Sequence, residues 1–211
     1  MKPSQFATAL AATTFRGIIA SADDLPLPPL PAWYPLEPWQ VSSLYTYNPQ
    51  ASPYGANASG LVLTITNPKM IAAVPAPHAS GGGYVVFLNS TAHCELHWTA
   101  DAATPYGHSS NSCVVADDYS HPRWSVTLNE VHEDLPEPGD HYLSVTFELV
   151  HNATIYATEG YKRMVGATTF QTGANLQGQC GPDGLCEFEL KNGSAPVLLQ
   201  PTLQECKSEC G

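Results

Sequence analysis

His93, Glu95 and His97 stand at alternate positions of the segment "AHCELHW". On a β-strand these positions share one face, and two imidazoles with one carboxylate form a ligand set that zinc accepts. The residues between them are apolar, so the same alternation also fits a half-buried strand whose polar face is in water. Because the alternation alone accounts for all of these residues, we favour the solvated face and predict no metal and no other cofactor.

A second group of charged side chains lies in the loop "HEDLPEPGDH", His132–His141. It lacks the regular spacing of a calcium loop and the second histidine of an H-E-x-x-H zinc site, so we interpret it as a solvated turn. Asp117 and Asp118 would point apart on a strand, while Glu187 and Glu189 would share its wet face. The chain also lacks a G-x-S-x-G elbow, a catalytic-cysteine context and a P-loop. The sequence therefore favours binding over catalysis and offers no catalytic residue, although an enzyme built from residues distant in sequence stays an alternative.

Six cysteines occur, and in the stretch "LQGQCGPDGLCEFEL" two of them flank a Gly-Pro-Asp-Gly turn. The five-residue gap there is wider than the gap of a zinc knuckle or of a typical redox pair, so a structural disulfide is favoured over both. Pairing through the shortest loops predicts the disulfides Cys94–Cys113, Cys180–Cys186 and Cys206–Cys210. Three disulfides are typical of proteins in oxidising compartments.

The N-terminal region is expected to direct secretion. Residues 1–22 combine a basic start, an apolar middle and the small-residue triplet Ala20-Ser21-Ala22, which together predict a signal peptide. Residues 23–38 form a proline-rich arm that suits an extended linker. Residues 39–211 are expected to form a single β domain with a cysteine-containing tail, and the mature protein is predicted to be extracellular.

The charge of the chain restricts its partners. The formal net charge is -11, and loss of Lys2 and Arg16 with the signal leaves six basic against nineteen acidic residues, or -13. Such a balance repels phosphate backbones, so we expect no nucleic acid partner. Apart from the signal, no stretch approaches the roughly 18 apolar residues of a membrane helix, so no membrane span is predicted.

Short alternating runs separated by turn residues fill the domain after Trp39. Side chains with period two predict strands with one buried face, and no sustained helical period is present. We predict an all-β fold, an antiparallel sandwich or barrel of about ten disulfide-stapled strands. These strands are expected at residues 61–66, 84–88, 94–99, 112–116, 123–129, 143–149, 153–158, 161–170, 186–190 and 197–200.

Two hairpin turns are predicted at His151-Asn152 and Asn192-Gly193, since Asn-Gly in particular suits a type I′ turn. Both asparagines also begin N-x-Ser/Thr sequons. With the two further sequons, N-glycosylation is predicted at Asn57, Asn89, Asn152 and Asn192, and the two supposed hairpin tips are the preferred sites.

Aromatic residues gather at the start of the domain, at Trp33, Tyr34, Trp39, Tyr45, Tyr47 and Tyr54. They fit the capping of an open sandwich end and also the lining of a ligand surface, with capping the commoner use. If the protein acts by binding, we expect activity to depend on loops or on aromatic patches near Tyr45 to Tyr54.

Several segments resemble small secreted proteins of filamentous ascomycetes. These segments are "WQVSSLYTYNP", "SPYGANASGLVLTITNP", "CELHW", "PYG" and "FQTGANLQGQCGPDGLCEFELKNG", within residues 39–201. Their order is similar to the Alternaria-major-allergen-like group of cysteine-containing β-barrel proteins. The resemblance implies an extracellular β-rich protein, an effector or elicitor acting on a plant host, with no catalytic residue to carry over. The Cys206 to Cys210 tail and the proline arm depart from the pattern of that group.

The leading functional hypothesis is a secreted fungal protein that binds a host protein, a glycan or a small apolar ligand. The alternatives are a β-barrel isomerase or cyclase of a secondary-metabolite pathway, and a structural protein of the cell wall or spore surface.

Overall fold

The computed structural model describes residues 35–49, 58–77, 83–99, 111–116, 122–129, 141–182, 184–208 and 210. The predicted signal peptide and residues 23–34 of the proline arm lie outside these ranges. No helix in the described part of the chain is long and apolar enough to cross a membrane.

The described residues form strands and no helix. The strands are β1 (Trp39–Pro49), β2 (Ala58–Asn67), β3 (Ile71–Pro75), β4 (Tyr84–Phe87), β5 (Ser90–Thr99), β6 (Asn111–Ser112), β7 (Val114–Val115), β8 (Arg123–Asn129), β9 (Tyr142–Ile155), β10 (Thr158–Gln171), β11 (Leu176–Cys180), β12 (Leu185–Leu190), β13 (Val197–Leu199) and β14 (Thr202–Lys207).

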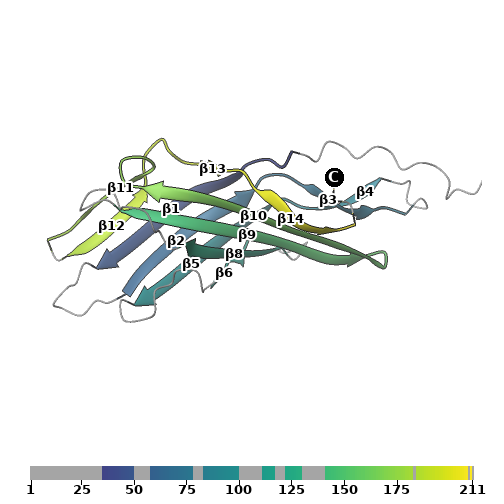
Figure 1. Cartoon of the computed structure of the whole chain (residues 1–211), viewed down its shortest axis with the longest axis horizontal. Coiled ribbons are helices and arrows are strands. Elements are labelled where there is room, and N and C mark those ends of the chain that lie inside the picture. Colours follow the sequence, from purple (N-terminus) through teal and green to yellow (C-terminus); the bar gives the residue numbers. More distant parts are fainter. Residues whose placement is uncertain are drawn as a thin grey trace, which may run out of the picture.

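Two antiparallel sheets pack face to face as a sandwich, which confirms the predicted all-β class and excludes the closed barrel (Figure 1). The seven-stranded sheet has the order β11-β12-β1-β2-β5-β7, with β13 also paired to β1. The five-stranded sheet has the order β14-β10-β9-β8-β6, and β3 with β4 forms a separate hairpin. Trp39 of β1 meets Trp124 of β8 edge to face, with ring centroids 4.6 Å apart, so the two sheets share one core.

The core follows from the alternation in the sequence. On β9, Leu143, Val145, Phe147 and Leu149 are buried, and the residues between them are half-buried on the outer face. The runs on β2, β8 and β12 bury their predicted apolar faces in the same way. Period-two patterning therefore decides which side of each strand enters the core.

The predicted turn at His151-Asn152 is wrong. Strand β9 continues through both residues, and the hairpin turns at Tyr156 and Ala157, whose φ angles of 50° and 64° fit a two-residue type I′ turn. His151 is fully buried, because the extended ends of β9 and β10 are covered by the β3–β4 hairpin (Figure 1). Asn152 is exposed on the outer face of β9 and does not lie at a hairpin tip.

The predicted turn at Asn192-Gly193 exists, but it does not close a hairpin. Gly193 has a φ of 84°, while Asn192 has no positive φ, so the turn is not of type I′. The flanking strands β12 and β13 do not pair with each other, because both pair with β1 at different points along its length.

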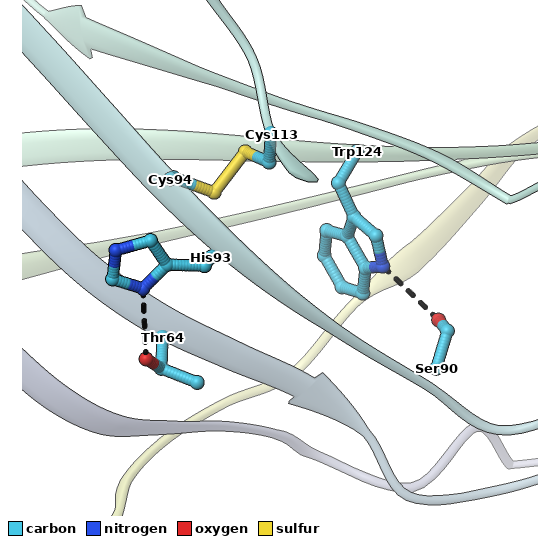
Figure 2. The surroundings of a disulfide bond; sticks show 6 residues. All are labelled: Thr64, Ser90, His93, Cys94, Cys113 and Trp124. Carbon is cyan, nitrogen blue, oxygen red and sulfur yellow. Dashed lines mark hydrogen bonds between the residues drawn. A yellow bond between two sulfur atoms is a disulfide. The ribbon is translucent and has the colours of Figure 1, made fainter. Parts of the chain in front are cut away.

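All six cysteines form the three predicted disulfides, Cys94–Cys113, Cys180–Cys186 and Cys206–Cys210. Figure 2 shows the first of them beside Trp124, whose Nε1 donates to Ser90 Oγ at 3.0 Å. Cys113 lies between β6 of one sheet and β7 of the other, and Cys94 belongs to β5. This disulfide therefore fixes the point where the chain crosses between the sheets.

Candidate functional site

The histidine trio of β5 lies on the outer face of the seven-stranded sheet. His93, Glu95 and His97 are exposed, while the apolar residues between them face the core. His93 Nδ1 lies 3.4 Å from Thr64 Oγ1 (Figure 2), and His97 Nε2 lies 2.6 Å from Glu95 Oε1. Among the described residues no group of three or more histidine, cysteine, aspartate or glutamate side chains could hold a metal ion. The trio is thus the solvated face of its strand and bonds to neighbouring polar groups.

The same outer face continues across β2, β1, β12 and β11. Strand register places Tyr47 beside Gly60 on β2, and Gly60 beside His97 on β5. Register on the other side of β1 places Tyr45 beside Glu189 and Tyr47 beside Glu187. We call this surface the β1–β12 face and define it by the residues that carry its polar and aromatic groups, Tyr45, Tyr47, Glu95, His97, Gln177, Gln179, Glu187 and Glu189.

The side chain of Tyr47 extends over β2 because Gly60 has no side chain to block it. A Cβ at Gly60 would lie 2.6 Å from the Tyr47 ring, which is a severe overlap. The ring therefore lies over the glycine, and the Tyr47 hydroxyl reaches His97 Nδ1 at 3.0 Å. With the contact between His97 and Glu95, a chain of hydrogen bonds fixes the orientation of the Tyr47 ring.

Tyr45 and its neighbours form the other half of the face. The Tyr45 hydroxyl donates to Glu187 Oε1, and Gln177 Nε2 donates to Glu189 Oε1 at 3.0 Å. The hydrogen bond to Glu187 is the main cause that raises the pKa of Tyr45 to about 12, followed by burial and by the charge of Glu187. The Tyr45 phenol therefore keeps its proton at any physiological pH, and its ring is held beside two carboxylates.

A groove of about 470 Å³ opens between these side chains. Its walls combine carboxylates, carboxamides and one tyrosine ring, and its lining residues are Tyr45, Gln177, Gly178, Gln179, Glu187, Phe188 and Glu189. Gly178 is needed there because a Cβ would lie 2.0 Å from the Glu187 carbonyl oxygen. Below the groove, Phe188 stacks on His141 with ring centroids 4.6 Å apart, and burial lowers the pKa of His141. Burial therefore favours the uncharged imidazole on the core side of β12.

Charge is distributed unequally between the two sheets. Of the six lysines and arginines after residue 22, Arg123, Lys162, Arg163 and Lys207 belong to the five-stranded sheet. Lys69 follows β2, and Lys191 follows β12 and lines a neighbouring hollow together with Glu189. The residues that line the groove itself include two carboxylates and no lysine or arginine. A ligand of this face should therefore be neutral or cationic.

The structure describes some of the other residues that the sequence singled out, and the rest lie outside the described part of the chain. Glu187 and Glu189 point outward as predicted, with Cys186, Phe188 and Leu190 inward. Trp39 is a core residue, and Tyr45 is 39% exposed. Asn89 and Asn192 are exposed beside strand ends. The predictions that fall outside the described residues are Trp33, Tyr34, Tyr54, Asn57, Asp117-Asp118 and residues 132–140 of the acidic loop.

Gln177 and Gln179 do not stand out in the sequence, because β11 is a short polar edge strand with glycine at its centre. Their position in the sequence could have indicated them, because the two glutamines alternate directly before Cys180. The disulfide from Cys180 to Cys186 places this segment beside β12, which contains Glu187 and Glu189. Comparison with known proteins adds no further assignment, since no protein-family model, no curated protein and no solved structure matches the chain.

Proposed function

We propose that the protein is an extracellular carbohydrate-binding protein and that the groove of the β1–β12 face holds a neutral or amino-sugar glycan. The observation that carries the proposal is the lining of the groove, where carboxylate and carboxamide groups flank the ring of Tyr45. Sugar hydroxyls both donate and accept hydrogen bonds, so they match carboxylate acceptors and amides that do both. An aromatic ring offers the apolar patches of a sugar a rigid surface.

Size and openness agree with a glycan. A groove of about 470 Å³ has the volume of an ordinary small-ligand site, which spans roughly 300 to 1,000 Å³. Because it lies open along the outer face of a sheet, neighbouring sugars of a longer chain can extend beyond it. The two carboxylates of the groove, Glu187 and Glu189, have no lysine or arginine beside them among the lining residues, so they would repel acidic polysaccharides.

The extracellular part of the proposal is supported by the disulfides. All six cysteines are paired, which is consistent with an oxidising compartment. The resemblance to secreted ascomycete proteins extends this to a fungal effector or elicitor whose ligand belongs to a plant host. The isomerase or cyclase alternative depended on a pocket inside a barrel, and the described sheets form a sandwich with a packed core.

The test is retention on a panel of polysaccharides, namely chitin, cellulose, xylan and polygalacturonate, followed by calorimetry with the matching oligosaccharides. We expect binding to at least one neutral or amino-sugar polymer and none to polygalacturonate. Tyr45→Ala and Glu189→Gln should each weaken that binding about tenfold, because each removes one contact worth about 1–2 kcal/mol.

Glu205→Gln provides the matched control, because Glu205 is an exposed carboxylate on the opposite sheet. It should leave binding unchanged. Wild-type protein that passes through all four polymers, or groove variants that bind as well as the wild type, would refute the proposal. Release of new reducing ends during the assay would instead assign an enzyme.

A further inference from the structure

The outer face of the five-stranded sheet contains a sequon within a strand. Asn152 is exposed near the end of β9, and Thr154, the third residue of the sequon, is exposed on the same face. An N-linked glycan needs an accessible asparagine side chain, and Asn152 provides one. Because Asn152 lies within a strand, it has a fixed neighbour on the adjacent strand.

That neighbour is Tyr161, which lies directly opposite Asn152 on β10. Opposed side chains on one face of an antiparallel pair have Cβ atoms about 4.5–5.5 Å apart. Lys207 approaches the Tyr161 ring from β14, on the far side of β10, and its Nζ lies 5.9 Å from the ring centroid. Lys207 lies over one face of the ring, so a group attached to the neighbouring Asn152 would use the other face or the edge.

The charged groups around Tyr161 are largely bonded to one another. Arg163 Nε donates to Glu148 Oε2 at 2.7 Å, and its Nη1 donates to Glu205 at 3.2 Å. Lys207 donates to both oxygens of Glu159. A second groove of about 470 Å³ lies here, and Tyr161 is one of its lining residues. The tyrosine ring is therefore the surface in this groove best suited to contact a sugar from Asn152.

We propose that an N-linked glycan on Asn152 packs its first N-acetylglucosamine against Tyr161 and covers the outer face of the five-stranded sheet. The inference rests on passage through a glycosylating secretory pathway, which is part of the proposed function, and not on the ligand of the β1–β12 face. Its consequence is that the glycan on Asn152 covers the outer face opposite the β1–β12 face.

The test uses protein secreted from a eukaryotic host, with the glycan at Asn152 located by glycopeptide mapping. Wild type, Asn152→Gln, Tyr161→Ala and the double variant are unfolded in denaturant. Loss of the glycan should raise the unfolding equilibrium constant about threefold or more when Tyr161 is present, and hardly at all in Tyr161→Ala. Tyr161→Phe keeps the ring and should retain the effect, whereas Asn192→Gln should act independently of Tyr161.

An unoccupied Asn152 in the mapped protein would overturn the inference, and so would additive effects of Asn152→Gln and Tyr161→Ala. If a variant of Asn152 fails to fold, enzymatic removal of the glycan from folded wild type and from Tyr161→Ala gives the same comparison. Neither result changes the polysaccharide binding that we expect, because that binding involves the other sheet.

Discussion

Replacing Cys94 and Cys113 together by alanine is expected to lower the free energy of unfolding by at least about 3 kcal/mol. The disulfide closes a loop with a sequence separation of 19, for which the chain-entropy model gives about that value. The loss of core packing adds to it, because Cys94 is fully buried. The bond also connects β5 to the crossing between the sheets, so its loss should loosen β6 and β7.

Chemical denaturation of the oxidised proteins measures the effect. The matched control is Cys206→Ala with Cys210→Ala, which opens a loop with a separation of 4 and should cost only about 2 kcal/mol. Equal losses of unfolding free energy in the two double variants would contradict the role assigned to the Cys94–Cys113 disulfide. A loss below about 1 kcal/mol on removal of this disulfide would contradict it as well.

Acid is expected to destabilise the protein through His151. This side chain has no exposed surface, stacks on Phe87 at 4.6 Å, and neither ring nitrogen has a hydrogen-bond partner in the described structure. Burial, and then the charge of Lys162, lowers its pKa to about 4 from an ordinary value of 6.5. The unfolded chain therefore binds a proton that the native state excludes. Stability is complete above pH 6.5 and falls by about 3 kcal/mol as the pH drops to about 4.

The measurement is the free energy of unfolding of wild type and His151→Leu between pH 7 and pH 4. As the pH falls from 7 to 4, the free energy of unfolding of the wild type should drop by about 3 kcal/mol more than that of the leucine variant, which has no group to protonate at this position. Hydrogen exchange at the His151 imidazole carbon reports its pKa in the wild type, even if the variant does not fold. A pH-independent difference, or a native pKa near 6.5, would show that His151 is not a buried neutral group.

The sequence predicted the strands wherever a clean alternation of buried and wet side chains persists. Strand β1 was missed because a bulge between Val41 and Ser43 shifts the phase of its alternation, so Val41 and Leu44 are both buried although they are three residues apart. Strand β3 was missed because residues 71–74 are all buried and do not alternate. Polar edge strands such as β11 and β14 bury too few side chains to show a pattern.

The turn at the end of β9 was misplaced for a related reason. Asparagine is common in turns, but here tertiary packing against Phe87 buries the preceding His151 within the strand. Tyr156 and Ala157, which form the actual turn, have no strong preference for positive φ. In the candidate site, Glu187 and Glu189 could be assigned to a wet face from sequence. Their contacts with Tyr45 and Gln177 could not, because they depend on which strands pair with β12.

We propose that a glycan binds in the groove between β1, β12 and β11. The most direct test of this proposal is a nuclear magnetic resonance titration of isotope-labelled protein with the oligosaccharide that the polysaccharide panel selects. We expect shifts in the side-chain amides of Gln177 and Gln179 and in the Tyr45 ring, while resonances of Tyr161 and Arg163 on the opposite sheet remain unchanged. Shifts that appear on the five-stranded sheet, with the groove resonances unmoved at saturation, would contradict it.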